Sequence, residues 1–283
     1  MGPEVARMAT SPALLETRGL SKRFVIRRLF LREQTVIDAL KHVDFQIAPQ
    51  RITALVGESG SGKSTLAGCL ARLERPDEGE IWFQGDEISR WNEQQLRSVR
   101  PKLQMVFQDS PGALNPRLSA AQIITEPLEV QRRERGSSLR AHACELMEEV
   151  GLSANLSART PLQLSGGQRQ RLAIARAIAL RPALLILDES LSGLDLSTQA
   201  QIVNLLLDLQ STYGLTYLLI SHDLSLVGQV ADFVAVMHDG QIVEHGKRTQ
   251  IFTAPQHDHT RSLLAFRRRL DADRQAASAG GRL

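Results

Sequence analysis

A glycine-rich loop between an apolar run and a helical segment constrains this chain more than any other feature of its sequence. Residues 57–64 read GESGSGKS and fit the spacing G-x-x-x-x-G-K-[ST]. The preceding run Ile52–Val56 is short and continuously apolar, as expected of a strand buried on both faces, and Lys63–Leu73 has a helical pattern. Glycines let backbone N–H groups surround a polyphosphate, and a helix N-terminus adds partial positive charge. The sequence therefore predicts a nucleoside triphosphate site.

Two side chains of this loop carry the expected chemistry. Lys63 is the residue type that reaches β- and γ-phosphates, and the Ser64 hydroxyl is the type that binds Mg²⁺. An ordinary Gly/Ser turn before a helix is the alternative, but the strand before the loop and the helix after it favour a phosphate site. The predicted nucleotide contacts are Gly57, Glu58, Ser59, Gly60, Ser61, Gly62, Lys63, Ser64 and Thr65.

An acidic pair follows a second apolar run. Residues 183–187 read ALLIL and precede Asp188 and Glu189. Because ligands of open parallel sheets bind at the carboxyl ends of the strands, Asp188 is expected to face the phosphate loop and to hold Mg²⁺, directly or through water. Glu189 can polarise the attacking water. Acids also end strands merely to meet solvent, but together with the loop the pair predicts hydrolysis.

Composition narrows the class of protein. The chain has 34 Lys and Arg against 31 Asp and Glu, and residues 261–283 alone contain six Arg and two Asp. The remainder is therefore close to neutral, which argues against nucleic acid as a partner. Two cysteines cannot build a disulfide framework or a four-thiolate metal site. No apolar run approaches the ~20 residues that span a bilayer, and the N-terminus lacks a signal peptide's apolar stretch.

Apolar runs alternate with helical patterns, which predicts a mainly parallel α/β sheet. Residues 22–34 are predicted to be a basic, irregular insertion between edge strands at 14–17 and 39–47, and few β-branched runs in 111–160 predict a helical subdomain. The termini, 1–13 and 267–283, are predicted to be disordered. The other expected strands are 52–56, 80–83, 103–107, 183–187, 216–221 and 233–237, and the expected helices are 63–73, 120–131, 138–150, 168–180, 199–213 and 224–230.

A second glycine-rich turn precedes another helix. Residues 164–168 read LSGGQ, and a helix N-terminus there would form a second anion site. The turn has no lysine and no following Mg²⁺ ligand, so it can contact a γ-phosphate but cannot process a nucleotide alone. The alternative is an ordinary helix cap.

These motifs in this order resemble the ATP-binding cassette (ABC) family over nearly all of residues 14–265. The resemblance implies a P-loop NTPase-type parallel sheet with an antiparallel β edge and an inserted helical subdomain at about 111–167. It places a disordered N-terminus at 1–13 and a basic disordered tail at 266–283. It also implies that two cassettes pair head to tail, so that ATP lies between the phosphate loop of one and the signature loop of the other. The signature residues that would contact ATP are Ser165, Gly166, Gly167 and Gln168.

The same resemblance assigns three further residues. Gln108 in MVFQD resembles the Q-loop glutamine, which contacts Mg²⁺ and the water and senses the membrane partner. Asp195, in the sequence SGLD, resembles the D-loop aspartate that crosses the dimer interface. His222 resembles the switch histidine that contacts the γ-phosphate, although a histidine before an aspartate would by itself be a cap residue. Metal ligands are thus Ser64, Gln108 and Asp188, and catalytic residues are Glu189, His222 and Gln108.

The adenine needs an aromatic platform, and the chain has 12 aromatic residues. Phe24 aligns with the family's stacking position, and Phe30 is its competitor because the insertion makes the spacing uncertain. Ser190 and Leu191 follow Glu189 where the family usually has Pro or Ala, and Gly193 stands where Ala is commoner. Residues of this size still fit the turn, so we expect an active site.

Two segments resemble importers of di- and oligopeptides or of nickel and nickel–metallophore complexes. They are residues 106–117, VFQDSPGALNPR, and 251–264, IFTAPQHDHTRSLL. Peptide and nickel cargo remain open alternatives. Relatives carry a cysteine cluster near the second segment, but no cysteine follows Cys144, so no iron–sulfur cluster is expected in this chain.

The resemblance implies an assembly at the membrane. The chain is expected to lie peripherally on the cytoplasmic face of the cell membrane, paired with a second ATPase subunit, identical or different, and with two permease subunits. An extracytoplasmic binding protein takes part indirectly. The rival is a soluble cassette ATPase, but such proteins tend to have two cassettes or a long coiled coil, and neither is found here. A non-hydrolytic binding module would require the loss of Glu189 or Gly166, and both are present.

Overall fold

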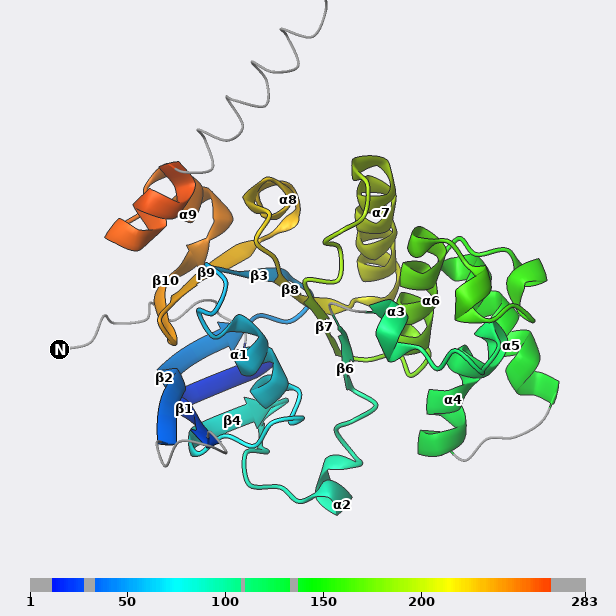
Figure 1. Cartoon of the computed structure of the whole chain (residues 1–283), viewed down its shortest axis with the longest axis horizontal. Coiled ribbons are helices and arrows are strands. Elements are labelled where there is room, and N and C mark those ends of the chain that lie inside the picture. The colour runs from blue at the N-terminus through cyan, green and yellow to red at the C-terminus, as the bar shows by residue number, and fades with distance from the viewer. Residues whose placement is uncertain (1–11, 28–33, 108–109, 133–136, 266–283) are drawn as a thin grey trace, which may run out of the picture.

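Two β-sheets form the centre of the molecule in the computed structural model, which describes residues 12–27, 34–107, 110–132 and 137–265 (Figure 1). The antiparallel sheet has the strand order β2-β1-β4-β5. Its strands are β2 (Gln34–Ile47), β1 (Leu15–Arg27), β4 (Glu78–Phe83) and β5 (Asp86–Glu87).

The main sheet has the order β10-β9-β3-β8-β7-β6. Strands β9, β3, β8, β7 and β6 pair in parallel, and β10 runs antiparallel to β9 at the edge. Every residue of β3, β7 and β8 is buried, which explains why their sequences are mostly apolar. The strands are β10 (Gln241–Lys247), β9 (Phe233–His238), β3 (Ile52–Val56), β8 (Thr216–Ile220), β7 (Leu184–Asp188) and β6 (Leu103–Val106).

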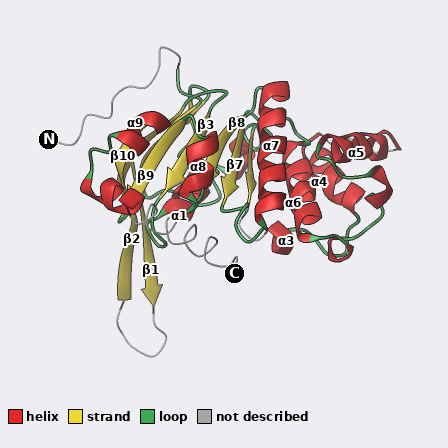
Figure 2. Cartoon of the chain, turned by 90° about the horizontal axis from the view of Figure 1, so that it is seen from above, coloured by secondary structure: helices red, strands yellow, loops and turns green. Residues whose placement is uncertain are grey.

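Helices cover the main sheet and build a separate lobe. In Figures 1 and 2, α4, α5 and α6 gather at the end of the molecule away from the antiparallel sheet, with α7 beside them. The lobe includes α3 (Ser110–Ala113), α4 (Ala120–Arg132), α5 (Ser137–Glu149), η1 (Ala154–Leu156), η2 (Pro161–Gln163) and α6 (Gly166–Ile178). The other helices are α1 (Lys63–Leu70), α2 (Glu93–Leu96), α7 (Leu196–Tyr213), α8 (Leu224–Val230) and α9 (Arg248–Thr253).

The core lies on both faces of the main sheet. Alternate residues of β9 point to opposite faces, so Val234 and Val236 pack with the helices while Ala235 and Met237 pack towards the antiparallel sheet. Phe45 of β2 is completely buried in this second cluster. The two sheets and α1 are therefore joined by one apolar cluster.

The predicted fold class is confirmed, but part of the expected local structure is wrong. Residues 22–27 and 34 are not an irregular insertion: they belong to β1 and β2, which extend well beyond the predicted edge strands. Val25 pairs with Val36, and Arg23 forms an ion pair with Asp38 at 2.7 Å, so Arg23 lies in an antiparallel strand pair. Residues 28–33 of the expected insertion lie outside the described residues. Strand β10 and helix α9 were not predicted at all. Residues 1–11 and 266–283, where disorder was expected, lie outside the described residues.

Among the residues that the structure describes, no helix is both long enough and apolar enough to cross a membrane.

We predict that Phe45→Ala lowers the free energy of unfolding by about 3–5 kcal/mol, because it leaves a cavity between the two sheets. Urea denaturation followed by circular dichroism measures the change. The matched control is Val25→Ala on the neighbouring strand, where the side chain is 55% exposed and the expected change stays within about 0.5 kcal/mol. Equal losses for the two variants would contradict the assignment of Phe45 to the core.

Candidate active site

The phosphate loop is held between the two sheets by close backbone contacts. A Cβ atom at Gly57 would lie 2.2 Å from the carbonyl oxygen of Met237 in β9. A Cβ atom at Gly62 would lie 2.5 Å from the carbonyl oxygen of Ala39 in β2, and Gly62 has a φ of 106°. Only glycine fits at either position. These contacts fix the loop at the carboxyl end of β3, ahead of α1.

The side chain of Lys63 folds back into the phosphate loop. Its Nζ donates to the carbonyl oxygens of Gly57 at 2.9 Å and Glu58 at 2.7 Å, and the side chain is 5% exposed. Burial lowers the pKa of Lys63, while the carboxylates of Glu189 and Asp188 oppose that effect. The ammonium group is thus placed where the loop would surround a polyphosphate.

A hydroxyl and a carboxylate meet next to the lysine. The Oγ of Ser64, in the first turn of α1, donates to Oδ1 of Asp188 at 3.3 Å. Asp188 ends β7 and is 6% exposed, and burial raises the pKa of its carboxyl group. Hydroxyl and carboxylate oxygens are the ligand types that suit Mg²⁺ with phosphates and water, so this pair fits the expected metal.

Glu189 follows in a strained turn beside His222. Its carboxylate Oε2 lies 3.6 Å from Nδ1 of His222, the second residue after the end of β8. Glu189 has a φ of 43°, unusual for a residue with a side chain. Its backbone is fixed because its N–H donates to Ile220 at 3.0 Å and its carbonyl accepts from the hydroxyl of Ser192 at 2.6 Å. The turn therefore directs a partly buried carboxylate towards the histidine.

Lys63, Ser64 and Glu189 line a cavity of about 430 Å³ between the phosphate loop and strands β1 and β2. Glu189 also lines a neighbouring cavity of about 140 Å³, and His222 lies on that second cavity. Phe24 of β1 lines it together with Ile37, its cross-strand partner in β2. The predicted aromatic residue is therefore on the same cavity as Lys63, Ser64 and Glu189. The competitor Phe30 lies outside the described residues.

The LSGGQ loop lies elsewhere in the chain and does not line this cavity. Ser165 caps α6: its Oγ accepts from the N–H of Gln168 at 3.3 Å, and Gln168 Oε1 accepts from the N–H of Ser165 at 2.9 Å. The loop is therefore a helix cap, the alternative considered for it, and it also presents the start of a helix on the surface. A Cβ atom at Gly166 would meet no atom within 4 Å, which leaves open space there.

Asp195 also acts as a helix cap. Its carboxylate accepts from the N–H of Thr198 at 2.9 Å and from the Thr198 hydroxyl at 2.7 Å, and these bonds lower its pKa. Thr198 also limits the space at Gly167, where a Cβ atom would lie 2.7 Å from its Cγ2. The starts of α6 and α7 are thus in direct contact.

Gln108 lies outside the described residues. Phe107 before it follows β6 and is 41% exposed. The two residues after Glu189, which depart from the family pattern, are both buried: Ser190 is 3% and Leu191 4% exposed. The Ser190 hydroxyl has no hydrogen-bond partner within the described ranges.

Sequence reasoning missed the turn between β9 and β10. The N–H of Gly240 donates to the carbonyl of Ser61 at 3.0 Å, and Asp239 forms an ion pair with Lys41 at 2.6 Å. Asp239 and Gly240 line the nucleotide cavity. The sequence carries no signal for the hydrogen bond between Gly240 and Ser61, because that bond joins backbone atoms.

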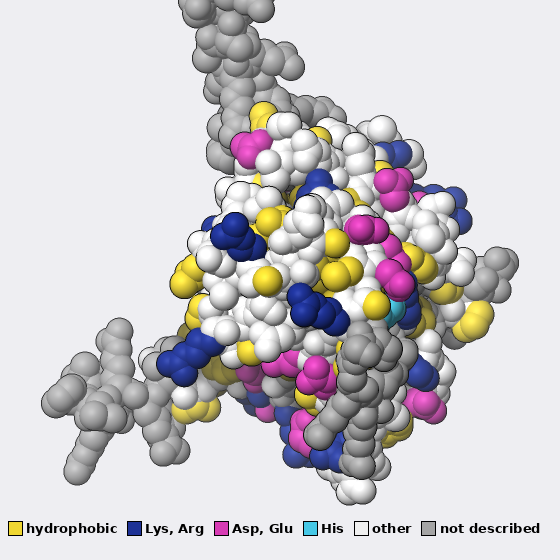
Figure 3. All heavy atoms as spheres, turned by 90° about the vertical axis from the view of Figure 1, so that its right-hand side faces the viewer, with side chains coloured by type: hydrophobic (Ala, Val, Ile, Leu, Met, Phe, Trp, Pro, Cys, Tyr) yellow, Lys and Arg dark blue, Asp and Glu magenta, His cyan; other side chains and the backbone are white. Residues whose placement is uncertain are grey.

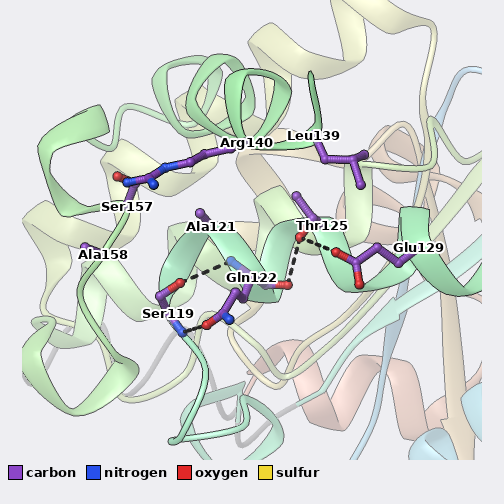
Figure 4. A pocket seen from close by; sticks show the side chains of 9 residues that line it. All are labelled: Ser119, Ala121, Gln122, Thr125, Glu129, Leu139, Arg140, Ser157 and Ala158. Carbon is purple, nitrogen blue, oxygen red and sulfur yellow. Dashed lines mark hydrogen bonds between the residues drawn. The ribbon is translucent and has the colours of Figure 1, made fainter. Parts of the chain in front are cut away.

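A second cavity, of about 360 Å³, lies in the helical lobe (Figure 4). It is lined by α4 and α5, and its polar groups largely bond to one another: Gln122 Oε1 accepts from the N–H of Ser119 at 2.9 Å, and Thr125 donates to Glu129 at 3.4 Å. None of the predicted site residues lines it. The cavity that holds Lys63 is therefore the candidate active site.

Comparisons with known proteins agree with this geometry. The family model described as ABC transporter matches residues 40–192, which is more than half of the chain. The chain is 45% identical over 260 residues to the "Probable peptide ABC transporter ATP-binding protein y4tS" of Sinorhizobium fredii, covering 90% of this chain and 72% of that protein. It is 42% identical to the "Dipeptide transport ATP-binding protein DppF" of Escherichia coli, covering 92% and 78% of the two chains.

A third relative is much longer than this chain. The "Glutathione import ATP-binding protein GsiA" of Salmonella typhimurium is 44% identical over 253 residues, which cover 89% of this chain but 41% of that protein. Among solved structures, a dimeric ATP-binding cassette in a post-hydrolysis state bound to ADP and Pi superimposes with a TM-score of 0.74 at 29% identity, covering 83% of this chain and 98% of that one.

We predict that Gly57→Ala weakens ATP binding by about tenfold or more, because its methyl group would collide with the Met237 carbonyl and displace the loop. Isothermal titration of the purified chain with ATP measures the effect. The control is Gly19→Ala, which also has a positive φ, 57°, but no atom within 4 Å of the added Cβ. That variant is expected to lose about 1 kcal/mol of stability and to bind ATP unchanged. Normal affinity in Gly57→Ala would contradict the close contact.

Proposed function

This chain belongs to the ABC transporter family and is an ATPase, and we propose that it drives the uptake of di- or oligopeptides through partner permeases. The observation that carries the proposal is one cavity lined by Lys63, Ser64 and Glu189, with Asp188 bonded to Ser64 and His222 beside Glu189. Relatives with 42–45% identity are named as ATP-binding proteins of a peptide ABC transporter, of dipeptide transport and of glutathione import.

The side chains of the cavity divide the work of hydrolysis. Lys63 and the loop N–H groups bind the phosphates, and Ser64 and Asp188, with Gln108, would hold Mg²⁺. The bound ion supplies positive charge to the phosphate oxygens. Glu189 orients the attacking water and accepts its proton, and His222, 3.6 Å from the Glu189 carboxylate, would contact the γ-phosphate. Phe24 stacks on the adenine.

A second cassette completes the site in this proposal. The signature residues Ser165–Gln168 lie outside the cavity of their own chain, and the start of α6 is an anion-binding surface. Large apolar side chains flank the signature and D-loops: Leu162 is 80% exposed and Leu196 82% exposed. Such side chains suit an interface between subunits. We infer that the signature loop and Asp195 of one subunit meet the phosphate loop of another, identical or different.

We propose that the helical lobe is the part of the chain that contacts the two permease subunits. Phe107 is exposed at the end of β6, where a shallow groove runs along α6 past Ala173, Arg176 and Ala177. This groove connects the strand that leads to Gln108 with the helix that begins at the signature. A permease segment bound in this groove would contact both the strand and the helix. This supports the proposal that residues 111–167 are the coupling subdomain. The chain would then lie peripherally on the cytoplasmic face of the membrane and receive cargo from an extracytoplasmic binding protein.

The names of the relatives favour peptide cargo over nickel. Those compared here are named for peptide, dipeptide or glutathione transport. The nickel or nickel–metallophore alternative is therefore not favoured, and neither is a soluble cassette ATPase. We propose that residues 14–265 form the ATP-binding domain.

We predict that Glu189→Gln in the reconstituted transporter slows ATP hydrolysis and peptide uptake by about a hundredfold or more, because an amide cannot accept the proton of the attacking water. Phosphate release and uptake of a labelled dipeptide into vesicles measure the two activities. ATP binding is expected to remain. The control is Glu145→Gln on α5, whose side chain is 71% exposed, and which is expected to leave both activities unchanged.

The same vesicles test the cargo. Uptake of dipeptide but not of Ni²⁺ is expected. Uptake of Ni²⁺ alone would replace the peptide assignment, and undiminished activity in Glu189→Gln would refute the mechanism.

We predict that Phe24→Ala weakens ATP binding by about two- to tenfold through the loss of stacking on the adenine. The matched variant is Phe30→Ala, which is expected to bind ATP normally. Titration with ATP and with inorganic triphosphate separates the effects, because only ATP carries the base. If Phe30→Ala weakens ATP binding while Phe24→Ala does not, the platform is Phe30.

A further inference from the structure

A C-terminal segment, residues 255–265, is fixed to the edge of the main sheet. The two carboxylate oxygens of Glu244 in β10 accept from the N–H groups of Gln256 at 2.8 Å and His257 at 3.1 Å. Residues 258–265 are helical, with Thr260 completely buried and Leu264 in the core. The segment is thus an ordered part of the cassette and packs on β9 and β10.

His259 of this segment stacks on His238, the last residue of β9. The ring centroids are 3.8 Å apart and the planes are inclined by 28°. The His259 backbone is oriented by a hydrogen bond from its N–H to Nδ1 of His257 at 3.1 Å. Burial lowers the pKa of His259, and His238 lowers it further, against the opposing effect of the Glu58 carboxylate. The lowered pKa favours the neutral form of His259, which suits ring stacking.

His238 is adjacent to the contacts that fix the phosphate loop. The residue before it, Met237, presents the carbonyl oxygen that lies against Gly57. Two residues after it, Gly240 donates to the carbonyl of Ser61 at 3.0 Å. The end of β9 therefore contacts the phosphate loop through its backbone while its last side chain contacts His259.

We propose that His238 and His259 are positioning residues, which hold the end of β9 and with it the phosphate loop in the geometry that binds ATP. Neither ring lines the nucleotide cavity. Without the stack, the end of β9 and the phosphate loop can leave that geometry. The apparent affinity for ATP then falls in proportion to the fraction of molecules in which the loop is still formed. Once ATP is bound the loop is formed, so the rate of hydrolysis is unaffected.

The proposal rests on ATP binding by this chain and not on the cargo or the membrane partners. A failure of peptide uptake would therefore leave it standing, and a failure of the test below would leave the peptide proposal standing.

The test is the substitution His259→Ala in the full chain. We expect the dissociation constant for ATP to rise by about two- to tenfold, the range that loss of one aromatic pair gives. We expect kcat at saturating ATP to stay within about twofold, and KM to rise with the dissociation constant. Isothermal titration and phosphate release measure these quantities.

Two further variants separate positioning from general destabilisation. His259→Phe keeps a flat ring against His238 and is expected to restore the affinity for ATP. His142→Ala removes a partly exposed histidine from α5 in the helical lobe and is expected to leave the affinity unchanged. A double substitution of His238 and His259 by Ala is expected to bind ATP no more weakly than the weaker single variant, because either change removes the same stack.

An unchanged dissociation constant in folded His259→Ala would overturn the proposal, and so would a His259→Phe variant as weak as His259→Ala. If thermal melting shows that His259→Ala is unfolded, Glu244→Gln decides. It replaces one of the two acceptors that hold Gln256 and His257 with a donor, so it loosens the segment from its other end. A raised dissociation constant in that variant supports the proposal, and an unchanged one overturns it.

Discussion

Two backbone contacts determine where the phosphate loop lies, and the rest of the site is arranged around them. Gly57 lies against the Met237 carbonyl, and Gly62 lies against the Ala39 carbonyl. Because hydrogen is the only side chain that fits at either position, the loop, the main sheet and the antiparallel sheet meet with a fixed spacing. This spacing brings the hairpin of β1 and β2 to the cavity, with Phe24 on its wall. The antiparallel sheet is therefore part of the nucleotide site and not only an edge of the fold.

The parallel order of β3, β8 and β7 supplies the reacting groups. Because these strands are neighbours and run in the same direction, the residues that follow them emerge at one edge of the sheet: the loop after Val56, Asp188 and Glu189 at the end of β7, and His222 after β8. The left-handed backbone of Glu189 adds strain at the point where the carboxylate turns towards His222. A strained residue at this position is consistent with a turn that is held for its chemistry.

The sequence was most informative where a particular side chain is required. Lys63, Ser64 and Asp188 could be predicted because each follows a strand or begins a helix at a fixed spacing and each must be that residue type. The carbonyls of Met237 and Ala39 could not be predicted, because every residue has one and only the folded chain shows where it lies. The pairing of residues 23–27 with β2 was hidden by basic residues such as Arg23, whose charge is balanced across the strands by Asp38. Strand β10 was missed because it is only half-buried at a sheet edge.

The predicted site residues of one chain lie on two surfaces: the nucleotide cavity, and the surface that holds the signature loop and the D-loop. The contact between α6 and α7 joins these two loops. The capping box engages the N–H groups of Ser165 and Gln168, while the other first donors of α6 have no partner within the helix. Those donors can serve an anion only outside their own cavity, and the proposed second cassette would supply that anion. Thr198 packs on Gly167 and binds Asp195, so the signature and D-loops cannot move independently. In the proposed pair of cassettes, closure of a partner on one of these loops would therefore displace the other and link the bound nucleotide to the start of both helices.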